Sequence, residues 1–241
     1  MKRGSAGSRR RSRRLLVVGA LTGSSAAVAL AWWLLWVPNV RPDLRTGEAF
    51  GVDVSHHQGA IDWDAVAGDG IDFAYIKATE GGDLTDARFA ENWSEAARVG
   101  LDRGAYHFFT LCRPGDEQAE HFLRTAPPDP SALRPAVDLE LAGNCSDRPS
   151  ADQVYRELDR FLTEVEDAWG QSTLLYVGDD WESRYPVLDR SDRPRWLVSF
   201  LGRPDLDWTA WQLHGFAKVD GVTGGVDLDV ARLEELRDPS L

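Results

Sequence analysis

Two acidic residues, Asp138 and Glu140, alternate with apolar residues in the run 136–141, which reads AVDLEL. On a β-strand this alternation directs both carboxylates to one face and the apolar side chains between them to the other. Two carboxylates this close repel each other, so the pKa of one of them rises. A protonated acid beside an ionised carboxylate is the arrangement that glycosidic bond cleavage requires. The pair alone also fits the solvated face of an edge strand.

Two further acids stand near the ends of β-rich runs. Asp53 belongs to the run GVDVS, and Asp227 belongs to the run GVDLD. The carboxyl ends of parallel strands meet at one rim when the strands form a barrel, and only then do these acids join the first pair. Each of them singly also fits a turn or a helix cap, and we interpret Asp229 as such a residue.

Other catalytic chemistries find less support. His56, His57 and His107 together with Asp53 raise the alternative of a metal-dependent hydrolase. Adjacent histidines on a strand face opposite ways, so His56 and His57 cannot both bind one metal from a strand. The chain contains no GxSxG elbow, no P-loop and no strand-borne GxGxxG motif. We therefore expect no metal and no cofactor.

Charge is unevenly distributed along the 241 residues. The net charge of −12 argues against nucleic-acid binding, which usually needs a basic face, so we expect no nucleic-acid partner. Residues 1–14 nevertheless contain seven bases and no acid, and residues 15–37 contain no charge at all. An uncharged apolar stretch of this length can span a membrane, and the positive-inside rule keeps the basic tail in the cytoplasm.

These features predict a single-pass anchor in a bacterial cell membrane. Residues 1–14 form the cytoplasmic tail, 15–37 the transmembrane helix and 38–49 a short polar linker, which leaves the domain 50–241 outside. The alternative is a cleaved secretory signal, since AVALA (27–31) offers small residues at the spacing of a cleavage site. Either way, we expect the domain to work outside the cytoplasm.

The remainder of the chain reads as strands that alternate with helices. The β-rich runs are 50–55, 72–79, 104–109, 135–141, 173–177, 195–200, 209–213 and 226–230. The helical stretches are 62–67, 86–99, 116–125 and 151–169, the last with Ser150 as its N-cap. This alternation predicts βαβ units and a parallel sheet. Because the last three strands leave little room for helices, we expect an α/β fold with an incomplete TIM-like barrel of five β/α units and three strands.

Two cysteines each follow a predicted strand. Cys112 follows the third strand and Cys145 the fourth, so parallel neighbours place both loops at one rim. Outside the cytoplasm the two residues are able to pair, and we predict a disulfide between them. The alternative is two free thiols.

Seven tryptophans lie outside the apolar amino-terminal segment. Aromatic faces suit stacking on sugar rings, although most tryptophans belong to cores. Among the seven, Trp63, Trp181 and Trp211 are the ones we place in a groove.

Seven blocks, in order, make the chain resemble glycoside hydrolase family 25, the Chalaropsis-type lysozymes. The blocks are GVDVSHHQGAIDW (51–63), FAYIKATEGG (73–82), GLDRGAYHFF (100–109), PAVDLE (135–140), LLYVG (174–178), WQLHG (211–215) and GGVDLD (224–229). The resemblance implies a (β/α)5(β)3 barrel. It also implies hydrolysis of the β-1,4 bond between N-acetylmuramic acid and N-acetylglucosamine, with the polysaccharide of peptidoglycan as the partner.

The resemblance further implies roles for single residues. Glu140 would be the general acid, and Asp138 would assist the acetamido group of the substrate. Asp53 and Asp227 would complete the acidic floor. The positions implied to line the saccharide groove are Tyr106, Tyr176, Trp211 and Gln212. Lys77 and Glu80 lie in a matching block without a clear role, and His57 stands where the family often has an aromatic residue.

The sequence thus favours a peptidoglycan muramidase that acts as a monomer without a cofactor. One alternative is a non-catalytic cell-wall-binding module on the same fold, although pure binding does not need an acid pair. The other is a glycosidase that acts on a different N-acetylated polymer, which the DLE motif alone permits. The blocks around that motif favour the muramidase.

Overall fold

The computed structural model describes residues 31–237 of the chain. It separates into two compact units, residues 1–41 and 42–241. The predicted cytoplasmic tail and most of the predicted membrane segment lie outside the described residues. In the described part of the first unit, residues 31–36 are helical and are followed by the 3₁₀ turn η1 (Val37–Asn39). Within residues 31–237, no helix combines the length and the apolar character that crossing a membrane demands.

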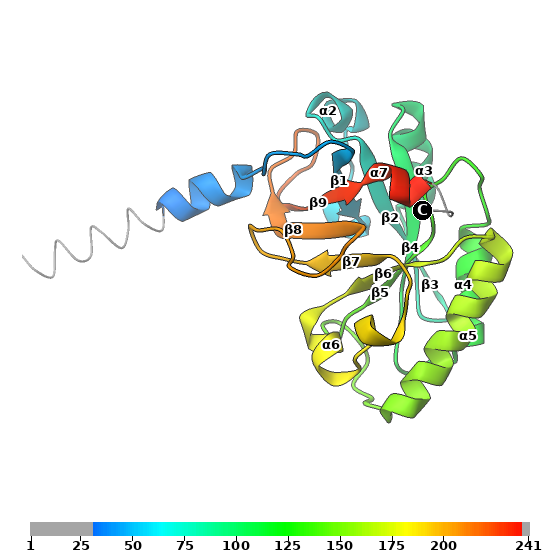
Figure 1. The fold of residues 1–241 in the computed structure, drawn as a ribbon. Coiled ribbons are helices and arrows are strands. Elements are labelled where there is room, and N and C mark those ends of the chain that lie inside the picture. Colours follow the sequence, from blue (N-terminus) through cyan, green and yellow to red (C-terminus); the bar gives the residue numbers. More distant parts are fainter. Residues whose placement is uncertain (1–30, 238–241) are drawn as a thin grey trace, which may run out of the picture. The chain divides into compact units, whose positions relative to one another are not determined.

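A closed barrel forms the centre of the second unit (Figure 1). Its strands are β1 (Glu48–Val54), β2 (Phe73–Glu80), β4 (Asp102–Phe108), β5 (Ala136–Leu139), β6 (Leu174–Val177), β7 (Arg195–Val198), β8 (Ala210–Ala217) and β9 (Val226–Arg232). The order in the sheet is β1-β9-β8-β7-β6-β5-β4-β2, and parallel pairing of β1 with β2 closes it. The two-residue strand β3 (Leu84–Thr85) is added at β2. The sheet is therefore complete, and the predicted incompleteness concerns only the helices.

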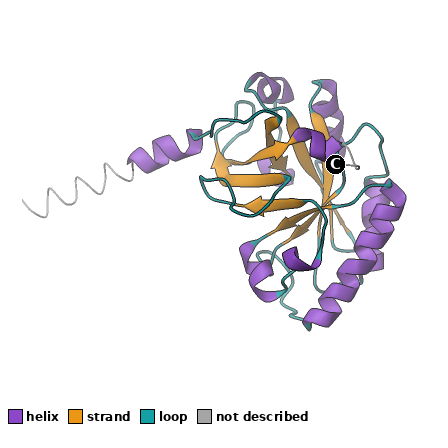
Figure 2. Cartoon of the chain, viewed as in Figure 1, coloured by secondary structure: helices purple, strands orange, loops and turns teal. Residues whose placement is uncertain are grey.

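Helices follow the first five barrel strands and cover the outside of the sheet (Figure 2). They are α2 (Trp63–Gly68), α3 (Phe89–Arg98), α4 (Gly115–Thr125), α5 (Ala151–Trp169) and α6 (Asp179–Arg184). In the described chain, the links between β7, β8 and β9 carry no helix, and the short α7 (Leu233–Arg237) follows β9. The predicted arrangement of five β/α units followed by three strands is confirmed.

Helix α5 shows how closely the sequence specifies these elements. Its apolar residues recur at helical spacing, and six of them are buried against the barrel. Ser150 is the N-cap, and its backbone N–H donates to Gln153 Oε1 at 3.1 Å. Gly170 ends the helix with φ of +66°, a conformation that glycine adopts without strain.

Aromatic rings fill the inside of the barrel. Phe73, Tyr75 and Trp196 are at most 2% exposed, and small residues such as alanine complete the cluster. Gly51 and Gly104 make room for two of these rings, because a Cβ at either position would lie 2.2 Å from Phe73 or Tyr75, respectively. The interior is thus packed solid, and a pocket can form only at an end of the barrel.

The amino end of the barrel is closed by Arg134, which is 3% exposed. Its guanidinium donates to the carbonyl oxygen of Glu235 from Nε at 3.1 Å and from Nη2 at 2.7 Å. Nη1 donates to the carbonyl oxygen of Ser172 at 3.2 Å, and Tyr75 Oη donates to the carbonyl oxygen of Arg134 at 3.1 Å. This buried charge is therefore well hydrogen-bonded.

Candidate active site

The carboxyl ends of the parallel strands surround a pocket of about 530 Å³. Five acids line it: Glu80 at the end of β2 and the four predicted acids, which are Asp53 from β1, Asp138 from β5, Glu140 just beyond β5 and Asp227 from β9. Asp53 and Asp227 are direct partners in the antiparallel register of β1 and β9. The sequence predicted that these acids converge only in a barrel, and the barrel brings all four together.

The alternation in β5 places its acids as predicted. Val137 and Leu139 are fully buried in the core between the sheet and the helices. Asp138 and Glu140 point the other way and line the pocket. One oxygen of Asp138, Oδ1, is buried and accepts no hydrogen bond from the described residues. The hydrogen-bonding capacity of this oxygen is therefore unused among the described residues.

Polar side chains from β6 and β8 fix the position of Asp53. Gln212 Nε2 donates to Asp53 Oδ2 at 3.0 Å, and Tyr176 Oη donates to Gln212 Oε1 at 3.2 Å. Tyr106 from β4 also lines the pocket. Three of the four predicted groove residues, Tyr106, Tyr176 and Gln212, therefore lie beside the acids.

Burial raises the pKa values of Asp53, Asp138, Glu140 and Asp227, and repulsion from neighbouring carboxylates adds to the effect at the first three. The pKa of Glu140 rises to about 7, first through burial and then through the charge of Asp180. The pKa of Asp138 rises well above its ordinary value through burial and the charge of Glu140. Burial also raises the pKa of Asp227 to about 6, and burial followed by the charge of Asp227 raises that of Asp53. The pocket therefore retains protons at a pH where exposed carboxyls have lost them.

Lys77 supplies positive charge to this acidic pocket. It lies on β2 at 8% exposure, forms an ion pair with Glu80 at 2.7 Å and stands 4.8 Å from the ring centre of Phe108. Its charge lowers the pKa values of Asp138 and Glu140 and so opposes part of the effect of burial. The sequence left Lys77 and Glu80 without a role, because only the fold places them beside the acids.

Asp180, at the start of α6, was missed by the sequence analysis. Its carboxylate accepts the backbone N–H groups of Leu141 at 3.2 Å and Ala142 at 3.1 Å. It thereby holds the loop that follows Glu140 while its charge raises the pKa of that residue. No local signal marks Asp180, because it lies two residues beyond the matching block LLYVG (174–178) and its role depends on β5 and β6 lying side by side.

Three tryptophans predicted for the groove lie elsewhere. Trp211 and Trp181 are fully buried and Trp63 is 2% exposed, all in the core between the sheet and the helices. Trp211 precedes Gln212 on β8, and neighbours on a strand face opposite sides, so the two cannot share the groove. The assignment of Trp211 to the groove is wrong. The described tryptophan that lines the pocket is Trp196, at 2% exposure.

Asp229 is not a turn residue. It lies inside β9, opposite Gly51 of β1, and is completely buried. Because side chains alternate along a strand, Asp227 and Asp229 point to the same side, with Asp229 one step deeper in the barrel. Our interpretation of Asp229 as a turn residue is therefore wrong.

The predicted disulfide is not present. Cys112 and Cys145 are free thiols, the first exposed and the second partly buried. Their loops do meet, because the thiol of Cys112 lies within hydrogen-bonding reach of Cys145. Burial and this neighbour raise the pKa of Cys145 to about 11.

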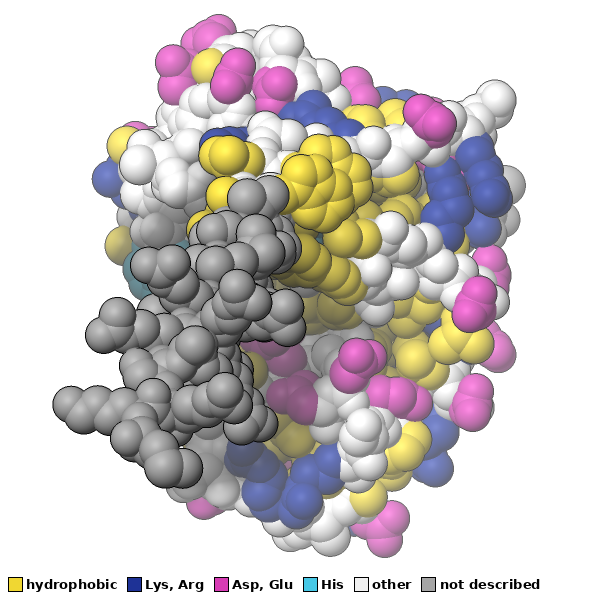
Figure 3. Space-filling view, turned by 90° about the vertical axis from the view of Figure 1, so that its left-hand side faces the viewer, with side chains coloured by type: hydrophobic (Ala, Val, Ile, Leu, Met, Phe, Trp, Pro, Cys, Tyr) yellow, Lys and Arg dark blue, Asp and Glu magenta, His cyan; other side chains and the backbone are white. Residues whose placement is uncertain are grey.

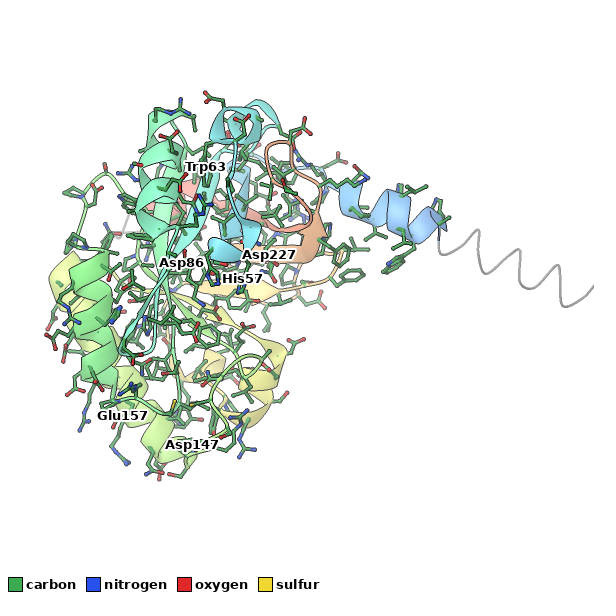
Figure 4. All side chains as sticks on the ribbon, turned by 180° about the vertical axis from the view of Figure 1, so that it is seen from behind. His57, Trp63, Asp86, Asp147, Glu157 and Asp227 are labelled. Carbon is green, nitrogen blue, oxygen red and sulfur yellow. The ribbon has the colours of Figure 1, made fainter. Side chains whose placement is uncertain are left out.

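The histidines do not assemble a metal site. His56 Nδ1 lies 2.7 Å from Asp86 Oδ2, and His107 is buried with Nδ1 2.8 Å from Thr79 Oγ1. His57 and Asp227 both line the pocket and are labelled in Figure 4. Across residues 31–237, no group of three or more His, Cys, Asp or Glu side chains has metal-binding geometry.

A closed (β/α)5(β)3 barrel with carboxylates gathered at the carboxyl ends of its strands defines a barrel-type glycoside hydrolase. The family model for glycosyl hydrolases family 25 matches residues 52–224. The chain belongs to this family.

Relatives and solved structures agree with this assignment. The uncharacterized protein YegX of Escherichia coli K12 is 34% identical over 198 residues, which cover 78% of this chain and 71% of that protein. Lysozyme M1 of Streptomyces globisporus is 30% identical over 90% of this chain and 91% of its own length. The structure of a family 25 glycosyl hydrolase from Bacillus anthracis matches with a TM-score of 0.72 and 32% identity, over 79% of this chain and 91% of that one.

Proposed function

We propose that this barrel is a peptidoglycan muramidase, which hydrolyses the β-1,4 bond between N-acetylmuramic acid and N-acetylglucosamine. The observation that carries the proposal is the pairing of Glu140, with a pKa of about 7, and Asp138, with an unsatisfied buried oxygen, in one pocket. Lysozyme M1, which this chain matches along nearly the whole length of that relative, supports the proposed class of substrate.

Glu140 is the general acid of the proposed reaction. With a pKa of about 7 it holds a proton in a large fraction of molecules at neutral pH, which an ordinary glutamate does not. It donates this proton to the glycosidic oxygen as the bond to the anomeric carbon breaks. Burial and Asp180 are the causes that keep the proton in place.

Asp138 assists the acetamido group of the substrate. Asp138 and Glu140 project from the same face of one strand, which does not supply the opposed carboxylates of a plain two-acid mechanism. The acetamido carbonyl oxygen therefore attacks the anomeric carbon, while Asp138 accepts a hydrogen bond from the acetamido N–H. Water then opens the cyclic oxazolinium intermediate and gives its proton to the Glu140 carboxylate, which regenerates the acid.

The remaining pocket residues bind the saccharide. Asp53 and Asp227 form the acidic floor beneath the reacting sugar, where negative charge stabilises the positive charge of the transition state. Tyr106, Tyr176 and Gln212 contact the sugar from neighbouring strands. No step of this reaction requires a cofactor.

A membrane anchor would suit this substrate. Acidic side chains recur across the face of the protein shown in Figure 3, and peptidoglycan layers are themselves anionic, so diffusional encounter is unfavourable. We propose that residues 15–37 hold the domain 50–241 at the outer face of a bacterial membrane and so raise its local concentration. Release by signal cleavage is the alternative. Undiminished wall cleavage in cells after the domain is released would contradict the anchoring proposal.

The decisive experiment uses residues 38–241, which contain the whole barrel unit. The protein is incubated with purified peptidoglycan beside its Glu140→Gln variant, and new reducing ends are identified by mass spectrometry. Reducing-end muramic acid from the unaltered protein, absent with the variant, is the expected result.

Other outcomes identify the alternative functions. Reducing-end glucosamine would keep the acid but overturn the bond assignment. Cleavage of chitin in preference to peptidoglycan would indicate another N-acetylated polymer. Binding without cleavage, unchanged in Glu140→Gln over a broad pH range, would indicate a wall-binding module.

A further inference from the structure

Beneath the floor of the pocket lies a carboxyl group that the proposed reaction does not use. Asp229 has no exposed surface. Its Oδ1 accepts a hydrogen bond from Trp196 Nε1 at 2.9 Å. Its Oδ2 is buried and accepts none from an N–H or hydroxyl group of the described residues. Asp53 on β1 points to the same side of the sheet, because β1 pairs with β9 so that Gly51 lies opposite Asp229 and Asp53 lies opposite Asp227.

Two neighbouring buried carboxyl groups that point to the same side of the sheet are more stable with one proton between them. Asp53 Oδ2 is already occupied by Gln212 Nε2, just as Asp229 Oδ1 is occupied by Trp196. The oxygens that remain are acceptors when both groups are ionised, and two adjacent buried negative charges repel strongly. One shared proton removes a charge and supplies the missing donor at the same time.

We propose that Asp53 and Asp229 share one proton at neutral pH, and that this hydrogen-bonded pair, rather than Asp53 alone, is the fixed anionic floor of the pocket. Asp229 acts as a positioning residue through Asp53. The sharing of the proton stands on the geometry of the pair. Only its consequence for turnover rests on the proposed muramidase function.

The pair completes a hydrogen-bonded chain across the barrel. With the shared proton as the link between Asp53 and Asp229, the chain runs from Tyr176 through Gln212 to the pair and ends at the indole of Trp196. Both of its ends are anchored on large aromatic side chains of β6 and β7. Asp53 is therefore held in one orientation, and the pair carries one negative charge instead of two.

Other titratable groups face the pair from the surrounding strands, and their effects favour retention of the proton. Those groups are Asp227 on β9, Asp138 on β5, Tyr75 on β2, Tyr106 on β4 and Tyr176 on β6. Burial raises the pKa values of both Asp53 and Asp229 well above the ordinary range, and the charge of Asp227 adds to this effect. The tyrosines are neutral at these pH values and supply no countercharge.

The test replaces the shared proton by a permanent donor. In Asp229→Asn the amide N–H donates to Asp53, which then stays ionised, so the pair no longer takes up a proton on folding. The full chain and this variant are unfolded with urea between pH 5.5 and 7.5. Exposed Asp205→Asn is the matched control for loss of an acid.

Linkage gives the expected size of the difference. A proton held only by the folded protein makes the unfolding constant rise about tenfold for each pH unit. Across the two units the unfolding constant of the unaltered chain should therefore rise roughly 100-fold more than that of Asp229→Asn. Asp205→Asn should follow the unaltered chain. Equal pH slopes for the unaltered chain and Asp229→Asn would overturn the proposal, whether or not the protein cleaves peptidoglycan.

A second readout connects the pair to turnover. Asp229→Leu leaves Asp53 with Gln212 as its donor and removes the donor at position 229, so its kcat should be roughly tenfold or more below that of Asp229→Asn, with little difference in KM. Equal activity of the Asn and Leu variants would remove the positioning role. If neither the unaltered chain nor any variant cleaves peptidoglycan, the proposed function is wrong. The pH dependence of the unfolding constant still shows whether Asp53 and Asp229 share a proton.

Discussion

The two ends of the barrel handle buried charge in opposite ways. At the amino end, the guanidinium of Arg134 is hydrogen-bonded to backbone carbonyl oxygens of Ser172 and Glu235. At the carboxyl end, Asp138 has a buried oxygen without a donor among the described residues, and the acids around it have raised pKa values. The amino end therefore stabilises the fold, whereas ionisation of the acids at the carboxyl end destabilises it.

This contrast separates structural polar groups from reactive ones. A polar group that stabilises the fold is buried together with its hydrogen-bond partners. A group that must bind a ligand or transfer a proton keeps a hydrogen-bonding position unoccupied. The pocket acids reduce stability at neutral pH because ionising them inside the protein is costly. The contrast predicts opposite effects of substitutions at the two ends.

Removing the acid should have the largest effect. We expect Glu140→Gln to lower kcat by about 10²- to 10⁴-fold, because the glutamine amide donates no proton to the leaving oxygen. Its melting temperature at pH 8 should equal or exceed that of the parent, since a buried charge is removed. Reducing-end release and calorimetry measure the two effects. Glu164→Gln, on the exposed side of α5, is the control, and a large loss of stability in Glu140→Gln would contradict the contrast.

Removing the guanidinium at the opposite end should do the reverse. Arg134→Ala leaves the partly buried carbonyl oxygens of Glu235 and Ser172 without their donors, so we expect about 3 kcal/mol of lost stability. The kcat of the folded fraction should be unchanged. Urea unfolding measures the loss, and exposed Arg98→Ala should cost much less. A fall in kcat without a fall in stability would break the distinction between the two ends.

The pH dependence of stability should reflect the pocket end. Glu140 and Asp227 have folded pKa values of about 7 and about 6, above their ordinary values. Their contribution to stability is therefore complete below pH 4 and is lost as the pH rises through these folded values. We expect a melting temperature about 5 °C higher at pH 5 than at pH 8, and a shallower dependence in Glu140→Gln. Stability that rises over this range would contradict the raised pKa values.

The smallest effect concerns the acid that supports Glu140 from α6. Asp180→Asn keeps an oxygen for the N–H groups of Leu141 and Ala142 but removes the charge that raises the pKa of Glu140. The alkaline limb of the activity profile should move down by about half a pH unit. Exposed Asp179→Asn provides the matched control. A limb that does not move would show that burial alone sets the pKa of Glu140.

The sequence predicts the order and positions of the main strands and helices well. Strand and helix positions follow from hydrophobic spacing, and most predicted bounds lie within a few residues of the observed ones; for α5 the predicted range 151–169 coincides with the observed helix. Four of the five acids that line the pocket were found because each stands near a strand end in an alternating run; Glu80 was left without a role. Short elements such as β3 and α6 were missed, since they carry too few residues to show a period.

The errors arise where the partner in space decides the role. Trp211 and Asp229 each had an informative neighbour, Gln212 and Asp227, whose inward direction fixes theirs by alternation. Lys77 and Asp180 had no such local signal, because their effect on Glu140 depends on which strands and helices lie side by side. Residues of a type that can take part in catalysis are recognised in a sequence. The neighbouring charges that set their pKa values are known only once the barrel is closed.

The position of β9 between β1 and β8 also governs when the pocket comes into existence. Asp53 belongs to the first strand of the barrel and Asp227 to the last, and antiparallel pairing of β1 with β9 joins them. A chain emerging from the ribosome or crossing a membrane has no complete set of pocket acids until its final strand docks, because contacts so distant in sequence form late. The full set of pocket acids therefore exists only after the last strand has been synthesised and has paired with the first.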